Sequence, residues 1–221
     1  MIKKFIYLLT FAIISMLAFS CGENKTGNTG SLTIIHMNDT HGRDEEEIII
    51  TKGDNPQTNH KYGAARRATY IKEVKATNDN VLILHAGDTI TGSVYSTVFK
   101  GRDEVDIMNM IGVDAATIGN HFVDYGLENF TEIMKERKFP TLSINIRNKS
   151  DGSLYATPYI ITNVNGLNVA IIGLTTTDAV YNPEYVKDLI FDEEIKALKD
   201  FVKKTPLHKT NDITILLSHI G

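Results

Sequence analysis

Four short runs of apolar, mostly β-branched residues each lead into a polar segment, and this repeated pattern limits the folds open to the chain. The runs lie at residues 31–37, 81–85, 115–118 and 213–217. The polar segments after them are Asn38-Asp39-Thr40-His41-Gly42, Gly87-Asp88, Gly119-Asn120-His121 with Asp124, and Ser218-His219. Apolar runs of this kind indicate buried strands. Since loops after the strands of an open α/β sheet meet at one edge, we expect these polar side chains to gather there.

Helical patterns alternate with these strands along the chain. Apolar residues recur at helical spacing in four stretches, residues 62–75, 103–111, 127–138 and 192–204. Residues 141–145 indicate one more strand, and Asn165-Gly166, inside the β-rich stretch 159–174, is a strong hairpin signal. We therefore predict an α/β protein with mixed β-sheets flanked by helices.

Other segments are expected to serve the fold alone. The acidic run 44–47 and the polar residues near it are expected to form an exposed loop. Tyr95 and Phe99 are expected to belong to the core. His36 and His85 lie inside apolar strands, so we expect them to be packed or hydrogen-bonded and not to bind a metal.

The polar segments carry residue types that divalent cations bind. Asp39 and His41 stand two apart at a strand end, where extended backbone would send both side chains the same way, so the pair could hold one cation. The Asp88 carboxylate has two oxygens and could bridge two cations. Asn120 offers an amide oxygen and His219 an imidazole at the same rim. Such mixed ligands suit Zn²⁺, Mn²⁺ or similar ions; they exclude a thiolate site and argue less strongly against Mg²⁺.

A candidate catalytic pair lies beside these ligands, because His121 follows Asn120 directly and Asp124 comes three residues later. A nearby carboxylate fixes the tautomer of an imidazole and favours its charged form. A histidine held in this way beside two cations could stabilise a phosphoryl transition state or protonate the leaving oxygen. The residue types therefore point to hydrolysis of a phosphate ester. One such segment alone could be a polar turn, but four at strand ends favour a site.

The first 30 residues have the pattern of an export signal and a tether. Two lysines precede an apolar core at residues 5–19, and Cys21 is the only cysteine. We expect residues 1–20 to be a lipoprotein-type signal peptide, Cys21 to carry the lipid, and residues 21–30 to be a polar tether. This places the protein in a bacterial cell envelope, lipid-anchored to a membrane and either periplasmic or surface-exposed. The alternative is an ordinary cleaved signal, a coincidental cysteine and a secreted protein.

The net charge argues against one class of partner. The chain has a formal charge of −4 and lacks the basic clusters of nucleic-acid-binding proteins. We therefore expect no nucleic acid as partner. A small phosphate ester would have to be attracted by local metal charge and not by the field of the whole protein.

These motifs together resemble the 5'-nucleotidase/UDP-sugar hydrolase family, whose members are dimetal phosphatases with a calcineurin-like metallophosphoesterase domain. The resemblance is carried by the four polar segments and by Tyr62-Gly63-Ala64-Ala65-Arg66, and it covers about residues 31–221. It implies a metallophosphatase-like sandwich of mixed sheets. It also implies two divalent metal ions and a nucleoside 5'-monophosphate or UDP-sugar as substrate, attacked by a metal-bound hydroxide.

The resemblance further implies a role for each site residue. Asp39 and His41 would bind one metal, Asp88 would bridge, and Asn120 and His219 would bind the second metal. His121 with Asp124 would form the catalytic pair.

Two departures from the family pattern bear on activity. The family's Gly-Asn-His-Glu-Phe-Asp reads Gly119-Asn120-His121-Phe122-Val123-Asp124 here, so Phe122 replaces a glutamate. The sequence also lacks the later Gly-His-x-(His/Gln/Asn) element and the C-terminal domain of the family, which activity could require. The alternative is therefore an inactive truncated fragment that keeps the fold, as a binding module or a relic, or one part of a longer product. The strand at 213–217 would then have an exposed edge.

Overall fold

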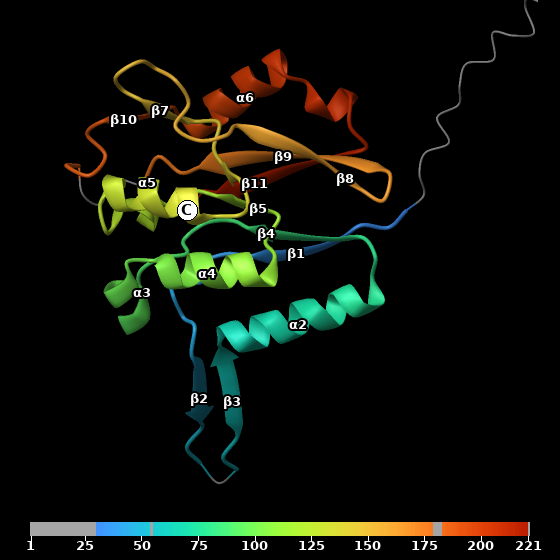
Figure 1. Ribbon diagram of the computed structural model, residues 1–221, viewed down its shortest axis with the longest axis vertical. Coiled ribbons are helices and arrows are strands. Elements are labelled where there is room, and N and C mark those ends of the chain that lie inside the picture. Colours follow the sequence, from blue (N-terminus) through green and yellow to red (C-terminus); the bar gives the residue numbers. More distant parts are fainter. Residues whose placement is uncertain (1–29, 54, 179–182, 221) are drawn as a thin grey trace, which may run out of the picture.

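Two β-sheets pack face to face and helices cover their outer faces (Figure 1). The computed structural model describes residues 30–53, 55–178 and 183–220. The strands are β1 Thr33–Met37, β2 Glu46–Ile50, β3 Thr58–Tyr62, β4 Val81–His85, β5 Ala115–Thr117, β6 Thr141–Leu142, β7 Ile146–Asn148, β8 Tyr159–Val164, β9 Leu167–Thr175, β10 Leu189–Phe191 and β11 Ile213–His219. The helices are α2 Ala64–Thr77, α3 Val94–Phe99, α4 Arg102–Ile111, α5 Leu127–Glu136 and α6 Glu194–Lys204, with short 3-10 turns η1 Asn120–Val123 and η2 Leu207–Lys209.

The first sheet is parallel and carries most of the polar segments. Its order is β1-β4-β5-β6, and β1 pairs with β4 in register from Thr33 opposite Val81 to Met37 opposite His85. The second sheet has the order β11-β9-β8, with β9 parallel to β11 and antiparallel to β8. Because β1, β4 and β5 are parallel neighbours, their carboxyl ends deliver loops to a common edge, and His219 at the end of β11 reaches the same edge beside Ala86.

Alternation of side chains along the strands builds three layers of core. On β4, Leu82 and Leu84 face the second sheet, while Ile83 faces α2 and α4. On β9, Ile171 joins the layer between the sheets and Ile172 packs toward α6. Figure 1 shows the resulting order, with α2 and α4 on one side and α6 on the other. The predicted α/β fold with mixed sheets and flanking helices is confirmed.

Most predicted elements are confirmed within a few residues, including the hairpin at Asn165-Gly166. There β8 and β9 meet through two residues at φ 47° and 90°, the left-handed pair that a tight hairpin turn requires. Of the predicted strand 141–145 only Thr141–Leu142 form a strand, β6, which pairs with β5, while β7 follows the stretch and pairs with β10. Within the described residues, β11 lies at one edge of its sheet. No helix in the described part of the chain is long and apolar enough to cross a membrane.

Two predictions about the region before α4 are wrong. Within the expected loop around residues 44–56, Glu46–Ile50 form β2, which pairs with β3 after the loop in an antiparallel hairpin that projects from the body (Figure 1). The β-branched residues of β2, with Ile48 opposite His60, favour this pairing. Tyr95 and Phe99 are not in the core, because α3 is a short surface helix on which they are 43% and 51% exposed. Tyr95 donates a hydrogen bond to Glu45.

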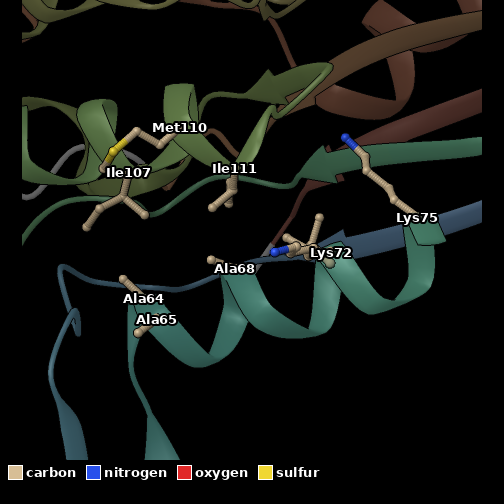
Figure 2. A pocket seen from close by; sticks show the side chains of 9 residues that line it. Ala64, Ala65, Ala68, Lys72, Lys75, Ile107, Met110 and Ile111 are labelled. Atoms are coloured by element: carbon tan, nitrogen blue, oxygen red, sulfur yellow. The ribbon is translucent and has the colours of Figure 1, made fainter.

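The packing of α2 against α4 leaves an apolar groove of about 480 Å³ (Figure 2). Ile71 of α2 and Ile107, Met110 and Ile111 of α4 contribute apolar side chains, and Lys72 and Lys75 from α2 also line it. The described residues that line the groove include no carboxylate and no imidazole. The groove therefore lacks the groups that the predicted chemistry needs.

A cluster of carboxylates joins the hairpin base to the helices. Asp44 lies against Arg67 of α2 at 3.3 Å and near Asp103 and Glu104 of α4. Burial, followed by the charges of Glu104 and Asp103, raises the pKa of Asp44 to about 7, against an ordinary value of 3.8. The folded chain therefore keeps a proton on Asp44 at a pH where the unfolded chain has released it.

This shift predicts a pH-dependent stability that Asp44→Asn should remove. Between pH 4 and 7 unfolding releases the Asp44 proton, so the free energy of unfolding should fall as pH rises and then level off above 7. At pH 8 the variant should be more stable by about 1 kcal/mol, a value discounted for solvent screening. Urea unfolding at pH 5 and 8 measures this difference. Asp106→Asn, at an exposed position of α4, is the control; equal pH slopes in Asp44→Asn and the unmodified chain would contradict the assignment.

The predicted signal peptide at 1–20, the lipid site Cys21 and the tether up to residue 29 lie outside the described residues. These features of the N-terminus stay predictions.

Candidate metal centre

The polar segments meet at the carboxyl ends of β1, β4, β5 and β11. The segment after β1 is held against the segment after β4 by backbone hydrogen bonds. The Asp39 N–H donates to the Gly87 carbonyl at 3.1 Å, the His41 N–H to the Asp88 carbonyl at 3.1 Å, and the Gly42 N–H to the Thr89 carbonyl at 3.0 Å. Two ligand-bearing loops that are far apart in sequence are therefore fixed together.

The sequence had suggested an extended backbone at Asp39 and His41, and this expectation is wrong. Asp39, His41 and Asp88 have φ of 51°, 49° and 54°, the left-handed region that non-glycine residues rarely adopt. Asp39 and His41 still converge, with the His41 Nε2 3.7 Å from an Asp39 oxygen. Each such residue costs on the order of 1–3 kcal/mol, and such strain persists where surrounding hydrogen bonds over-determine it, often at functional sites.

The Asp88 carboxylate is the centre of the cluster, and its side chain is only 3% exposed. Its oxygen lies 3.9 Å from the His41 Nε2 and 3.3 Å from the His219 Nε2. Two sets of possible ligand atoms, each within 4.8 Å of one another, include it: His41, Asp88 and His121, and Asp39, Asp88 and His219. Burial acts to raise the pKa of Asp88, but the hydrogen bonds from His219 and the His121 N–H lower it below its usual value.

His41 is oriented by a group that the sequence could not reveal. Its Nδ1–H donates to the Ile90 carbonyl at 3.0 Å, because a carbonyl oxygen only accepts. A neutral His41 ring then carries its lone pair on Nε2, the atom that faces Asp39 and Asp88. A second hydrogen bond of this kind is the usual support of a metal-binding histidine.

His219 and Asn120 complete the other side of the cluster. The His219 Nδ1–H donates to the Ala86 carbonyl at 2.8 Å, while its Nε2 lies 2.8 Å from the Asn120 side-chain oxygen. The hydrogen bond to Asp88 raises the pKa of His219, against the opposite effect of burial. Nε2 therefore faces two oxygens that can only accept, and positive charge, either a proton or a cation, is needed between them.

His121 and Asp124 form the pair that their spacing suggested. The His121 Nδ1 lies 2.7 Å from an Asp124 oxygen, and the His121 backbone N–H donates to Asp88 at 2.9 Å. The His121 ring stands edge-on to the His41 ring, with centroids 5.2 Å apart. The carboxylate thus fixes the tautomer, leaving Nε2 as the second functional atom of the ring.

A glycine at position 119 allows the loops to approach this closely. A Cβ built on Gly119 would lie 2.1 Å from an Asp88 side-chain oxygen and 2.3 Å from the Asp88 backbone nitrogen. No side chain fits at that position. Phe122, which follows the ligand segment, points away into the core and packs edge-on against Phe130, with ring centroids 5.0 Å apart.

His36 and His85, which were predicted to be packed or hydrogen-bonded and not to bind a metal, have different surroundings. His85 is fully buried and hydrogen-bonded, as predicted. His36 is not packed, because its side chain is exposed and borders a cavity of about 290 Å³. Asn38, Asp39 and His219 also line this cavity. The candidate centre therefore opens to a space that can admit a small ligand.

The residues present fit divalent cations. The two sets supply imidazole nitrogens and carboxylate oxygens, they share a buried carboxylate, and the lone pairs of His219, Asn120 and Asp88 face one another. Donors of this mixed type match Zn²⁺, Mn²⁺ or related ions. In the structure, the ligand set that contains Asp39 also contains His219, whereas the family resemblance assigns Asp39 and His41 to the same metal. In both assignments Asp88 is shared by the two metal positions.

Comparisons with known proteins agree with this chemistry. The family model described as "Calcineurin-like phosphoesterase" matches residues 32–221. A snake venom 5'-nucleotidase from Gloydius brevicauda is 37% identical over 217 residues, covering 95% of this chain and 36% of that protein. Protein UshA of Escherichia coli strain K12 is 33% identical over 223 residues, covering 97% of this chain and 38% of that protein.

A solved structure shows the same similarity in three dimensions. The NAD nucleotidase NadN of Haemophilus influenzae matches with a TM-score of 0.74 and 32% identity, over 85% of this chain and 34% of that one. The chain thus spans little more than a third of the length of the curated relatives that it matches.

Proposed function

Because the chain belongs to the calcineurin-like phosphoesterase family, we propose that the cluster around Asp88 hydrolyses phosphate esters with two divalent cations. One observation carries this proposal. The buried Asp88 carboxylate belongs to two sets of ligand atoms at once, which is what a bridging ligand must do. A site for a single ion would use only one of the two ligand sets.

We assign the ligands from the described contacts and the family resemblance together. Asp39, His41, Asp88, Asn120 and His219 would hold the two ions, with Asp88 shared. Two bound cations supply positive charge that polarises a phosphoryl group and makes a water acidic. The chain's own contribution is to fix the ligand atoms, since the Ile90 and Ala86 carbonyls orient the rings of His41 and His219.

His121 and Asp124 would act on the substrate directly. With Nδ1–H donated to Asp124, the His121 ring can hold a proton on Nε2 and place it near the oxygen that leaves the phosphorus. The carboxylate stabilises the charged ring while the proton is held there. A hydrogen bond to a developing negative charge stabilises the transition state more than the ground state.

The relatives support a nucleotide as the substrate class, because the names 5'-nucleotidase and NAD nucleotidase refer to nucleotides. Together with the family resemblance of the motifs, they lead us to propose a nucleoside 5'-monophosphate or a UDP-sugar for this chain. The 290 Å³ cavity beside Asp39 and His219 can take the phosphate end of such a molecule.

For the location we propose the bacterial cell envelope, with Cys21 as the lipid attachment site that holds the protein to a membrane.

His121→Ala tests the catalytic role. Phosphate release from AMP with added Mn²⁺ or Zn²⁺ should fall by about 10²–10⁴-fold, the usual contribution of a positioned acid or base. Asp124→Asn should cause a smaller loss, because an amide still accepts the Nδ1 hydrogen bond but no longer stabilises the charged ring. Release that is equal in the unmodified chain and in His121→Ala would refute the role.

Metal uptake separates this role from that of a ligand. Calorimetric titration with Mn²⁺ should give the same two equivalents in His121→Ala as in the unmodified chain. Loss of one equivalent would instead show that His121 binds an ion, as its membership in one ligand set permits.

A further inference from the structure

His85 contacts the loops after β1 and β4 and has no exposed surface. It is the last residue of β4, three residues before Asp88. Its Nε2 is 3.1 Å from the Thr40 hydroxyl oxygen, and its Nδ1 is 3.2 Å from the Gly87 backbone nitrogen. Thr40 stands between Asp39 and His41, and Gly87 precedes Asp88. One buried ring therefore touches two of the four segments from which ligands project.

The partners of the ring determine its tautomer. The Gly87 N–H can only donate, so the His85 Nδ1 must carry a lone pair. Burial, with smaller effects from Arg67 and Arg137, lowers the pKa of His85 to about 3, so the ring is neutral. Its single hydrogen is then on Nε2, which donates to the Thr40 hydroxyl oxygen.

The contacts continue beyond Thr40 to α4 and α2. The Thr40 hydroxyl bonds to the Glu104 carboxylate, which is fully buried on α4. The Arg67 Nη2 lies 3.1 and 3.2 Å from the two Glu104 oxygens. Since a carboxylate only accepts, the Thr40 hydrogen points to Glu104, and its oxygen is left to accept from His85. The ligand loops are thus connected to α2 and α4.

We propose that His85 is a positioning residue of the metal centre. Held as the Nε2–H tautomer between Gly87 and Thr40, it fixes the segment of Asp39 and His41 against the segment of Asp88. It is not a ligand, because both ring nitrogens are already engaged. The inference rests on the proposed function, since it concerns the ligands assigned above. Its reason is geometric: a shift of Thr40 would move both neighbouring ligands, whose left-handed backbone leaves little tolerance.

The matched pair Thr40→Val and Thr40→Ser tests the positioning through metal affinity. Valine keeps the shape and removes the hydroxyl, whereas serine keeps the hydroxyl. In calorimetric titrations of the full chain, Thr40→Val should bind Mn²⁺ 10–100-fold more weakly, the usual loss when support behind a ligand is removed. Thr40→Ser should stay within about threefold of the unmodified chain. Equal affinities in Thr40→Val and the unmodified chain would overturn the proposal.

A second measurement needs no metal and no variant. Nitrogen-15 NMR of the histidine rings should show His85 protonated on Nε2 only, without titration between pH 5.5 and 8. A ring protonated on Nδ1, or one that titrates in this range, would overturn the proposal even if Thr40→Val fails to fold.

Amide exchange distinguishes failure of the inference from failure of the proposed function. In the metal-free chain, Thr40→Val should speed exchange of the Asp39, His41 and Gly42 amides, which bond to the segment 87–89, while Thr40→Ser should not. If the unmodified chain takes up no metal, the proposed function fails, and the ring tautomer and these exchange rates still decide whether His85 holds the two segments together.

Discussion

Replacing Asp88 by asparagine should abolish binding of both cations. Asp88 is the side chain shared by the two ligand sets, so its loss removes charge and one donor from each. We expect the affinity for Mn²⁺ or Zn²⁺ to fall by more than 100-fold, because even the loss of a supporting partner costs 10–100-fold. Calorimetry measures the uptake, and phosphate release from AMP should disappear with it.

Two features make this variant informative. Asparagine has nearly the size of aspartate, and its side-chain oxygen can still accept the His121 N–H bond, so the fold should persist. Asp39→Asn is the matched comparison, because Asp39 belongs to one set only and its loss should weaken one ion. Uptake of two ions by Asp88→Asn would exclude a bridging role, and with it the proposed arrangement of the site.

Replacing Arg67 by methionine should cause a large loss of stability. Glu104 is completely buried, and Arg67 donates to both of its oxygens. Removing one partner leaves a buried carboxylate without its cation, which typically costs 3–5 kcal/mol. Urea unfolding at pH 8 measures the free energy. Burial raises the pKa of Glu104, although Arg67 opposes this, so the loss should be smaller at pH 5, where the carboxylate takes up a proton more readily.

The double variant Arg67→Met with Glu104→Met separates the lost pair from lost packing. With neither charge present, the fully buried Glu104 carboxylate is gone and only the Arg67 contact with Asp44 is still lost, so most of the stability should return, as often happens when apolar residues replace a buried ion pair. If the double variant is as unstable as Arg67→Met alone, the cost comes from packing around the Arg67 side chain. A loss of less than about 1 kcal/mol in Arg67→Met would contradict the electrostatic explanation.

The sequence allowed prediction of those parts of the fold that depend on local patterns. The strand ending at His85 is a buried apolar run, and Asn165-Gly166 supplies the left-handed turn that a hairpin requires. The hairpin β2–β3 was missed because β3, Thr58–Tyr62, is mostly polar and is exposed at every residue, so its sequence shows no apolar alternation. Tyr95 and Phe99 were misplaced because an aromatic residue does not reveal whether its short helix has a covered face.

The candidate site could be predicted in its residues but not in its geometry. Polar residues after strand ends brought Asp39, Asp88 and His219 to attention, and the structure brings them within a few ångströms of one another. The carbonyls of Ile90 and Ala86, which orient two rings, belong to the backbone and leave no trace in residue type. The left-handed backbone of Asp39 and His41 follows from hydrogen bonds to a distant segment, and no local propensity indicates it.

The backbone hydrogen bonds between the segments 38–42 and 87–89 also bear on how cations would enter. These hydrogen bonds hold ligands of both metal positions, so a movement of the ligands at one metal position should also disturb the ligands at the other. The first cation to bind would order the shared Asp88 and its neighbours, so the second would meet ligands whose conformational entropy is already reduced. We therefore expect cooperative uptake, with a second association constant higher than the first, and we expect chelation to release both ions over a narrow range of free metal.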